Sequence, residues 1–143
     1  MPRPTVKYEP KHLPQQNIIA QNAGGVESPL MAAYGVVTGD MSSNGVELVP
    51  PGRQKKILFA WTIKSTGTGG SGDTVRLFEA ASATSSASGT AITEALSLNS
   101  VAVNTITVFG TISNAKITTS NGIYANNDAS GTDCVAFVIY TYV

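Results

Sequence analysis

The run KKILFAWTIK, residues 55–64, decides the fold class because its apolar residues alternate as they do along a strand. One face carries Ile57, Phe59, Trp61 and Ile63. The other face carries Leu58, Ala60, Thr62 and Lys64. We therefore predict a strand whose first face lies on a hydrophobic core and whose second face is less hydrophobic. On this assignment the indole of Trp61 is expected to be buried.

The C-terminal run DCVAFVIYTYV, residues 133–143, is apolar on both faces of an extended chain. One face would carry Val135, Phe137, Ile139 and Val143, and the other would carry Cys134, Ala136, Val138, Tyr140 and Tyr142. A strand that is apolar on both sides belongs inside a sheet that is covered on both faces. Because the sequence supplies no convincing helix as a cover, we expect a neighbouring subunit to cover one face.

From Asn17 onward the chain consists of short β-branched or aromatic runs between clusters of Gly, Asn, Ser and Pro. Strands are predicted at 17–21, 33–38, 45–49, 55–64, 74–80, 90–97, 101–112, 115–119, 122–126 and 133–143. The Asn-Gly pairs at 44–45 and 121–122 favour type I′ turns, so KITTSNGIYA, residues 116–125, is predicted to be a hairpin. Only SPLMAAYG, residues 28–35, and TAITEALSL, residues 90–98, have a helical alternative. The pattern predicts an all-β sandwich or barrel of about eight to ten short strands.

Four of the seven prolines lie within the first fourteen residues, among charged residues. Proline lacks an N–H and restricts the residue before it, so this segment is expected to be extended and unpaired. Residues 1 to about 16 are then either a docking arm or a disordered tail, and Val6, Tyr8 and Leu13 favour an arm. We divide the chain into an extended proline-rich N-terminal arm at 1–30 and one β-sandwich or barrel domain at 31–143.

Nine Lys and Arg balance nine Asp and Glu, and charged residues make up only 13% of the chain. A neutral chain has no electrostatic attraction to nucleic acid or to an anionic membrane, so neither is expected as a partner. Cys134 is the only cysteine, which excludes an internal disulfide and a cysteine-based zinc site within one chain. We see no secretory signal and no run of about 18 apolar residues. The protein is expected to remain in a cytosol or to leave it within a larger assembly.

The glycines of STGTGGSGDT, residues 65–74, have the spacing of a dinucleotide-binding loop, but that site needs a helix after the glycines. The residues that follow predict a strand, so we expect a loop between two strands. The single histidine, His12, lies in the proline-rich arm, which is a poor position for a general base. Asp128 and Asp133 flank a loop that either holds a calcium ion or is an ordinary Asn-rich turn. We expect no enzymatic activity, catalytic residue, metal, cofactor or small-molecule substrate.

The segment ILFAWTIKSTGTGGSGDTVRLFEAASATSSASGTAIT, residues 57–93, resembles a pattern in small β-rich structural proteins of tailed bacteriophages. The shared features are a strand, a Gly-rich loop, a DTVRL-x-E-like strand, and a Ser/Ala/Gly loop that ends in GTAIT. The segment is similar above all to capsid decoration (cement) proteins and related jelly-roll modules. The resemblance implies a jelly-roll or β-barrel body that forms a homotrimer on the capsid exterior of the virion, after synthesis in the host cytoplasm, with an arm that reaches neighbouring subunits.

The same resemblance implies a viral structural protein that binds the major capsid protein and stabilises the capsid by clamping neighbouring capsomers non-covalently. The expected interface residues are Arg3, Lys7, Tyr8, Lys11, Leu13, Ile18 and Ile19 of the arm, with Tyr140 and Tyr142 of the last strand. Two alternatives stay open. One is a carbohydrate-binding module that stacks a sugar on Trp61 or Tyr124, and the other is a tail-fibre or baseplate module of a phage.

Overall fold

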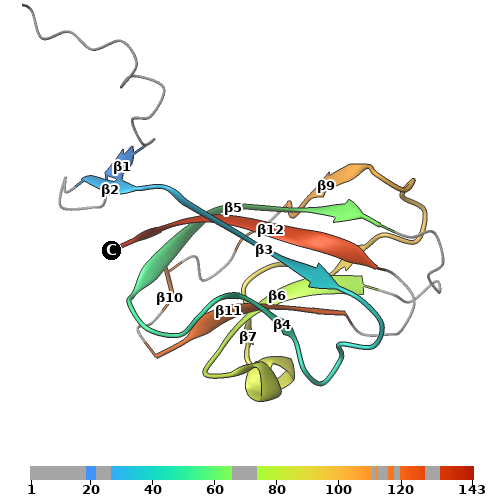
Figure 1. Ribbon diagram of the computed structural model, residues 1–143, viewed down its shortest axis with the longest axis horizontal. Helices are drawn as coiled ribbons and strands as arrows, with labels where there is room; N and C mark the ends of the chain where they lie inside the picture. The colour runs from blue at the N-terminus through green and yellow to red at the C-terminus, as the bar shows by residue number, and fades with distance from the viewer. Residues whose placement is uncertain are drawn as a thin grey trace, which may run out of the picture.

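The computed structural model describes residues 19–21, 27–65, 74–110, 112, 116–117, 120–127 and 133–143, with the backbone alone at 19–21, 27–28 and 116–117. In these residues the fold consists of two antiparallel β-sheets packed face to face, with a short 3₁₀ helix beside the second sheet (Figure 1). The prediction of an all-β sandwich is confirmed.

Each sheet is built from strands that are far apart in the sequence. The first sheet contains β3 (Met31–Val37), β5 (Lys55–Lys64), β9 (Ile106–Val108), β10 (Lys116–Ile117) and β12 (Cys134–Tyr142). The second sheet contains β4 (Val46–Val49), β6 (Thr74–Ala80), β7 (Thr90–Ala91), β8 (Leu96–Ser97) and β11 (Gly122–Asn127). In the first sheet β12 lies between β3 and β5, and β9 and β10 pair with the other side of β5. In the second sheet β11 lies between β4 and β6, and β7 and β8 pair with β6.

The strand order is that of a jelly roll. If β7 with β8, and β9 with β10, are each taken as one interrupted strand, the body has eight strands. Their orders are first–eighth–third–sixth in one sheet and second–seventh–fourth–fifth in the other. Rolling one long hairpin into two sheets gives this arrangement. The jelly-roll topology expected from the resemblance is therefore present in the backbone.

A β-bulge interrupts β5 where it pairs with β12. Ile139 lies opposite Phe59, and the next residue of β12, Tyr140, lies opposite Ile57. Leu58 is thus an extra residue without a partner of its own. One extra residue shifts the alternation, so every side chain beyond the bulge changes face.

The bulge makes part of the predicted face assignment wrong. Ile57 is buried in the core as predicted, but beyond the bulge the inward residues are Ala60, Thr62 and Lys64. The residues that point outward are Phe59, Trp61 and Ile63. Trp61 is half-buried on the outer surface of the sheet and not buried in the core as expected.

The hydrophobic core lies between the two sheets. It consists of Val37, Leu48, Val49, Ile57, Ala60, Val75, Leu77, Ile92, Leu98, Phe109, Ile123, Ala125, Cys134, Ala136, Val138 and Tyr140. The predicted division of β12 into two faces is confirmed: Cys134, Ala136, Val138 and Tyr140 face this core, and Val135, Phe137 and Ile139 are half-buried on the other side.

The two Asn-Gly pairs do not form hairpins, so that prediction is wrong. β3 and β4 lie in different sheets, as do β10 and β11, and the Asn-Gly pairs lie where the chain passes from one sheet to the other. Among the described residues, positive φ angles occur at Gly39, Gly52 and Asn104, and not in either pair. A Cβ at position 122 would lie 2.5 Å from the carbonyl oxygen of Val49, so glycine here permits a close backbone approach.

Both segments with a helical alternative are extended, in β3 and in β7 and β8. Among the described residues the helix is η2 (Ala83–Ser88), in the Ser-rich segment. The strand predicted after the Gly-rich loop is β6, and residues 66–73 of that loop lie outside the described residues. β1 (Ile19–Gln21) and β2 (Glu27–Pro29) form a separate two-stranded sheet at the base of the predicted arm. The arm residues before Ile19 lie outside the described residues.

Candidate interaction surface

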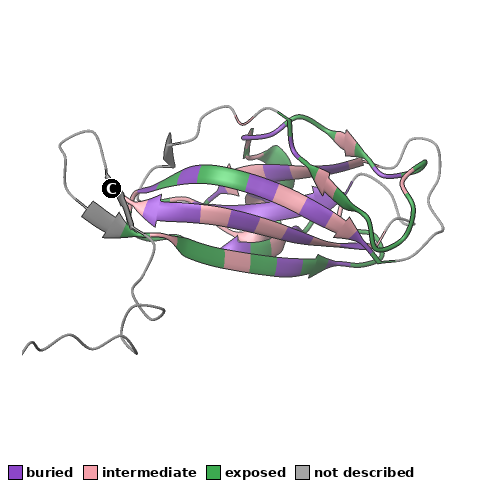
Figure 2. Ribbon diagram, turned by 90° about the horizontal axis from the view of Figure 1, so that it is seen from above, coloured by how far each residue is buried: buried purple, intermediate pink, exposed green. Residues whose placement is uncertain are grey.

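The outer side of the first sheet carries three cross-strand rows of apolar side chains. Residues directly opposite each other on antiparallel strands point to the same face. The rows are Val36–Val135–Ile63–Ile106, Tyr34–Phe137–Trp61–Val108 and Ala32–Ile139–Phe59. We call these side chains the outer apolar face. Figure 2 looks onto this sheet and shows exposed residues on β3 and β5 on either side of the half-buried residues of β12.

Four aromatic rings cross the centre of the outer apolar face. Trp61 and Phe137 stack with ring centroids 5.0 Å apart and an angle of 2° between planes. Tyr34 extends the stack from Phe137 at 5.9 Å, and Phe59 extends it from Trp61 at 5.6 Å. Aromatic residues are enriched in the cores of protein interfaces, where they supply large rigid contact areas.

The outer apolar face is open to solvent in the single chain. Tyr34 is 66% exposed, Val36 48% and Phe59 44%, while on β9 Ile106 is 60% and Val108 43% exposed. With about 4.8 Å between strands and about 6.8 Å between alternate residues, three rows on four strands cover roughly 300 Å² in projection. Contiguous apolar patches of this size on a monomer often mark interaction sites.

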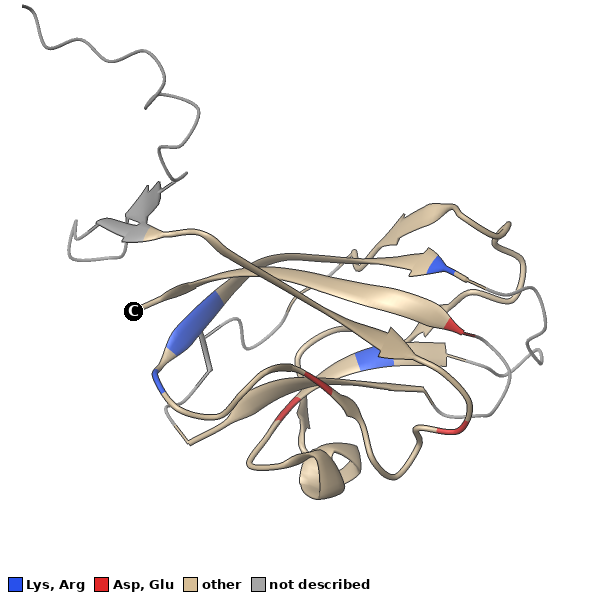
Figure 3. Ribbon diagram, viewed as in Figure 1, with Lys and Arg blue, Asp and Glu red and all other residues tan. Residues whose placement is uncertain are grey.

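The outer apolar face, as defined from the described residues, contains no charged side chain. In Figure 3 the middle of β3 and of β12 carries no charged residue, and the charges of this sheet lie near strand ends. Asp133 directly precedes β12, and the exposed Lys56 lies at the start of β5. Depletion of charge at the centre with polar residues around it is the composition of a protein–protein interface.

Buried Lys64 holds one end of β5, the strand that carries the centre of this face. Lys64 lies on the inner side of the sheet and is 2% exposed. Its Nζ donates to the carbonyl oxygens of Leu98 at 2.7 Å and Val101 at 2.9 Å. Carbonyl oxygens thus replace the water that would solvate the ammonium group, and they bind the 98–101 turn to β5.

Buried Lys55 has the corresponding role at the other end of β5. Its Nζ donates to the carbonyl oxygen of Asn121 at 2.9 Å, which fixes the crossing between the sheets. Burial lowers the pKa of Lys55, and the carboxylate of Glu79 partly opposes this effect. The two lysines therefore tie loops at both ends of the sandwich to the same strand.

The structure places the predicted tyrosines on the core side of β12. Tyr140 belongs to the core and is 6% exposed, and burial, with a contribution from Tyr142, raises its pKa to about 12. Tyr142 is half-buried, and the guanidinium carbon of Arg53 lies 4.4 Å from its ring centroid. The interface role of both tyrosines stays a prediction.

The arm residues named from the sequence fall outside the site that the structure describes. Arg3, Lys7, Tyr8, Lys11, Leu13 and Ile18 lie outside the described residues. Ile19 is described by its backbone alone, in β1. Their roles also stay predictions.

The residues considered for other chemistry are engaged in the fold. Tyr124 is 1% exposed and its hydroxyl donates to Glu47 Oε2 at 3.3 Å, so it cannot stack a sugar, which leaves Trp61 as the residue that the carbohydrate alternative named. Asp133 Oδ1 accepts from the backbone N–H of Gly39 at 3.1 Å, and Asp128 lies outside the described residues. Within the described ranges no three His, Cys, Asp or Glu side chains gather into a possible metal site, and no helix has the length and apolar character to cross a membrane.

Sequence reasoning did not single out the β3 and β9 parts of the outer apolar face. Tyr34 and Val36 lie in the segment MAAYGVV, whose alternation with Ala32 is the signal that could have placed them on one face. Ile106 and Val108 alternate in the same way but in a strand of only three residues. Alternation alone does not tell which of two faces is covered by the second sheet.

Comparisons with known proteins give one structural similarity. No known family and no curated protein matches the chain. A solved structure of the cyanophage Pam1 capsid asymmetric unit contains a similar chain. It is 12% identical, the alignment covers 90% of this chain and 95% of that chain, and the TM-score is 0.46.

Proposed function

We propose that the protein is a bacteriophage structural protein that forms a homotrimer, decorates the capsid exterior and stabilises the capsid by non-covalent clamping. The observation that carries the proposal is the outer apolar face, a contiguous exposed surface with four aromatic rings and no charged group. The resemblance of residues 57–93 to decoration proteins supports the phage assignment, and a jelly-roll body agrees with it. Such a protein acts by covering area and needs no catalytic residue.

A second copy of the chain is the proposed cover of the outer apolar face. In a threefold ring the outer apolar face of one copy would pack against a different surface of the next copy, and because the face has no charge it places no like charges together. Its footprint of roughly 300 Å² corresponds to the fully buried centre of an interface that covers about 800 Å² per partner. Leu58, at 39% exposed, is a further exposed apolar residue on β5 that could widen the contact.

The arm is the proposed clamp on the major capsid protein. Figure 1 shows β1 and β2 projecting from one end of the body, beside the C-terminus. The hydroxyl of Thr141 donates to the carbonyl oxygen of Pro29 at 3.1 Å, which fixes the base of the arm to the last strand. Several arms of one trimer that bind neighbouring capsomers would add their weak contacts, because later contacts become intramolecular.

The test is reconstitution of capsids that lack the protein. Purified full-length chain is added to these particles, and electron microscopy measures occupancy and symmetry. We expect density on the capsid exterior with threefold symmetry, and loss of occupancy when residues 1–16 are deleted, because the anchors of the arm are then missing.

Circular dichroism of the truncated chain is the control, and it should show an intact β-sheet body. Unchanged occupancy after truncation would rule out the arm as the clamp. Density at the tail in place of the capsid would contradict the decoration role and favour the tail-fibre or baseplate alternative.

A further inference from the structure

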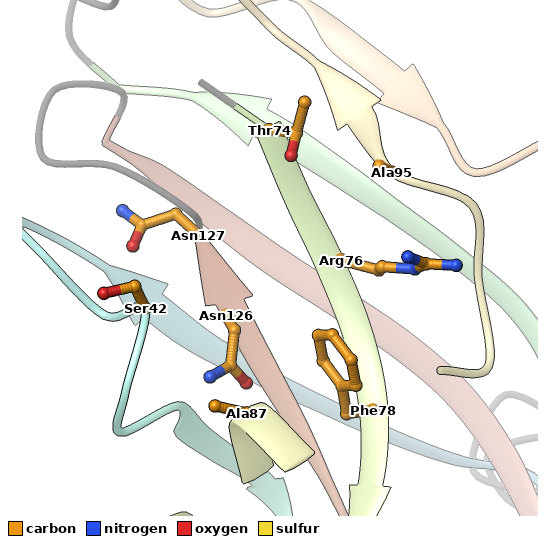
Figure 4. Close-up of a pocket in the computed structure, with 8 residues that line it drawn as sticks. All are labelled: Ser42, Thr74, Arg76, Phe78, Ala87, Ala95, Asn126 and Asn127. Carbon is orange, nitrogen blue, oxygen red and sulfur yellow. The ribbon is translucent and has the colours of Figure 1, made fainter. Parts of the chain in front are cut away.

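Three asparagines lie in or directly before β11, and two of them have a structural role. Asn126 and Asn127 line a pocket of about 270 Å³ on the outer side of the second sheet (Figure 4). Asn126 Nδ2 donates to the carbonyl oxygen of Met41 at 3.0 Å, and Asn127 Nδ2 donates to that of Gly39 at 2.6 Å. These two amides hold the loop before β4 against the strand. Asn121 differs, because its side-chain amide contacts a carboxylate and its main-chain carbonyl contacts a lysine.

Lys55, Asn121 and Glu79 meet at one end of the sandwich, between the two sheets. Lys55 begins β5 in the first sheet and is 0% exposed. Glu79 lies in β6 of the second sheet, two residues after the buried Leu77, so its side chain is on the same inner side of that strand. Lys55 Nζ donates to the carbonyl oxygen of Asn121 at 2.9 Å, and Asn121 Nδ2 donates to Glu79 Oε1 at 3.4 Å. The three side chains thus combine an amine, a carboxamide and a carboxylate.

Lys55 is placed as a nucleophile toward Asn121. Burial lowers the pKa of the Lys55 ammonium group, and the carboxylate of Glu79 only partly opposes this effect. A lower pKa increases the share of neutral amine, which is the form that attacks a carbonyl carbon. The main-chain carbonyl that binds Nζ belongs to the same residue as the side-chain carbon Cγ. A rotation of the flexible lysine stem can therefore bring Nζ to Cγ of Asn121.

Glu79 is placed to move a proton between the two nitrogen atoms. Its Oε1 accepts from Asn121 Nδ2, the atom that would leave. Its Oε2 is buried and has no hydrogen-bond donor among the described residues, so this oxygen is available to accept a proton. Glu79 and Asn121 also line an open hollow of about 240 Å³, which gives a leaving ammonia molecule a path to solvent.

We propose that Lys55 and Asn121 form an intramolecular isopeptide bond, with Glu79 as the catalytic residue. The neutral amine attacks Cγ of Asn121, and a bond forms between Nζ and Cγ. Glu79 takes a proton from Nζ and gives it to Nδ2, the bond between Cγ and Nδ2 breaks, and ammonia leaves. Nothing is oxidised or reduced, and no further reactant is needed.

The bond would join the start of β5 in the first sheet to the residue before β11 in the second. It forms once in each chain, so it is a covalent lock between the two sheets and not a turnover activity. The inference goes beyond the proposed capsid role and does not depend on it, because the reaction needs neither a capsid nor a second copy of the chain.

The test is the intact mass of the purified full-length chain. We expect a mass lower than that of the unmodified sequence by one ammonia molecule. Tandem mass spectrometry of a protease digest should find a branched peptide that joins the segment around Lys55 to the segment around Asn121. Protein kept at roughly pH 9 should lose ammonia faster than protein kept at roughly pH 7, since more of the lysine is then the neutral amine.

Variants of the three side chains assign the roles. Lys55→Met removes the nucleophile and Glu79→Gln removes the proton acceptor, so both variants should keep the full mass. The matched control is Lys56→Met, since Lys56 is the exposed neighbour of Lys55 in β5, and this variant should lose ammonia as the unchanged chain does. Circular dichroism reports whether each variant is folded. If Lys55→Met does not fold, Lys55→Arg takes its place, because a guanidinium keeps the charge and stays protonated.

A different reaction can also release ammonia from Asn121, since attack by the main-chain nitrogen of Gly122 on Cγ gives a succinimide. That product needs no lysine and yields no branched peptide. The isopeptide proposal is overturned if the unchanged chain keeps its full mass at both pH values, or if the loss of ammonia persists in the folded Lys55 variant. A bond that forms at an unchanged rate in Glu79→Gln would overturn the role of Glu79. None of these results would affect the capsid reconstitution, so the two proposals fail separately.

Discussion

Lys64 is a buried cation whose ammonium group is solvated by main-chain carbonyl oxygens of the 98–101 turn. Replacing it by methionine keeps the apolar stem but leaves these acceptors without their donor. We expect Lys64→Met to lower the free energy of unfolding by about 2–4 kcal/mol, as loss of a charged hydrogen-bond donor to buried partners does. Urea unfolding followed by circular dichroism measures the change.

The control lies on the same strand. Lys56 is exposed, and Lys56→Met should change the free energy of unfolding by no more than about 0.5 kcal/mol. Equal losses in the two variants would mean that the bonds to the turn contribute nothing beyond the general effect of removing a lysine from β5.

Cys134 should make the fold less stable as the pH rises through the alkaline range. Burial, with a contribution from Asp133, raises the pKa of its thiol from 9.0 to about 12. Between these values the unfolded chain has lost the proton and the folded chain keeps it, so stability falls as the pH rises. Above pH 9 the free energy of unfolding of the unchanged protein should therefore fall by up to about 1.4 kcal/mol per pH unit because of this thiol. Cys134→Val has no thiol and should not show this part of the fall.

Urea unfolding of both proteins at several pH values from 8 to 11 measures the difference. Tyrosines whose pKa values are also raised, such as Tyr124, affect both proteins and cancel in the comparison. Parallel curves for the two proteins would contradict the assignment to Cys134.

At the scale of elements, the crossing between β10 and β11 depends on close backbone contact at Gly122. An added Cβ would lie 2.5 Å from the carbonyl oxygen of Val49 and 2.9 Å from the nitrogen of Pro51, neither of which can rotate away. We expect Gly122→Ala to destabilise the fold by about 2 kcal/mol or more, because the backbone itself must shift. Thermal unfolding measures this as a lower midpoint.

Gly110 provides the matched control. A Cβ there would meet only the carboxyl group of Glu94, the end of a flexible exposed side chain, with Oε1 at 2.8 Å. Gly110→Ala should therefore leave the midpoint nearly unchanged. If both variants lower the midpoint by a similar amount, the effect of Gly122→Ala would come from the general change from glycine to alanine and not from the contact with Val49.

The same elements show what the sequence could predict. Alternation predicted β5 and β6 with their observed limits, because a period of two depends only on neighbouring residues. It failed at Leu58, since a bulge is set by the register with β12, far along the chain. The hairpin predicted from the Asn-Gly pairs was wrong for a related reason. Gly122 is needed because the backbone of Val49 leaves no room for a side chain, and a local sequence pattern carries no information about that distant contact. Sequence reasoning also missed the pocket on the second sheet, because its lining residues come from strands and loops that no local pattern places together.

At the scale of the molecule, the two sheets have outer surfaces of different kinds. One is the outer apolar face, and the other carries a polar pocket with asparagines and an arginine. Covering the first surface with protein would remove apolar area from water and is therefore favourable, whereas the second surface offers mainly polar groups.

The proposal that a second copy of the chain covers the outer apolar face can be tested by placing a charge in that face. Val36 and Val103 have similar exposure, 48% and 43%, but only Val36 belongs to that face. Val36→Glu should weaken self-association at least about tenfold, because the carboxylate would be buried without a partner. Sedimentation equilibrium measures association, with Val103→Glu as the control expected to behave like the unchanged protein. The half-buried Trp61 gives a second readout, since its quenching by acrylamide should fall if copies of the chain associate through this face. If the unchanged protein stays monomeric at all concentrations and the quenching of Trp61 does not change with concentration, a second copy is not the cover, and the capsid itself would have to supply it.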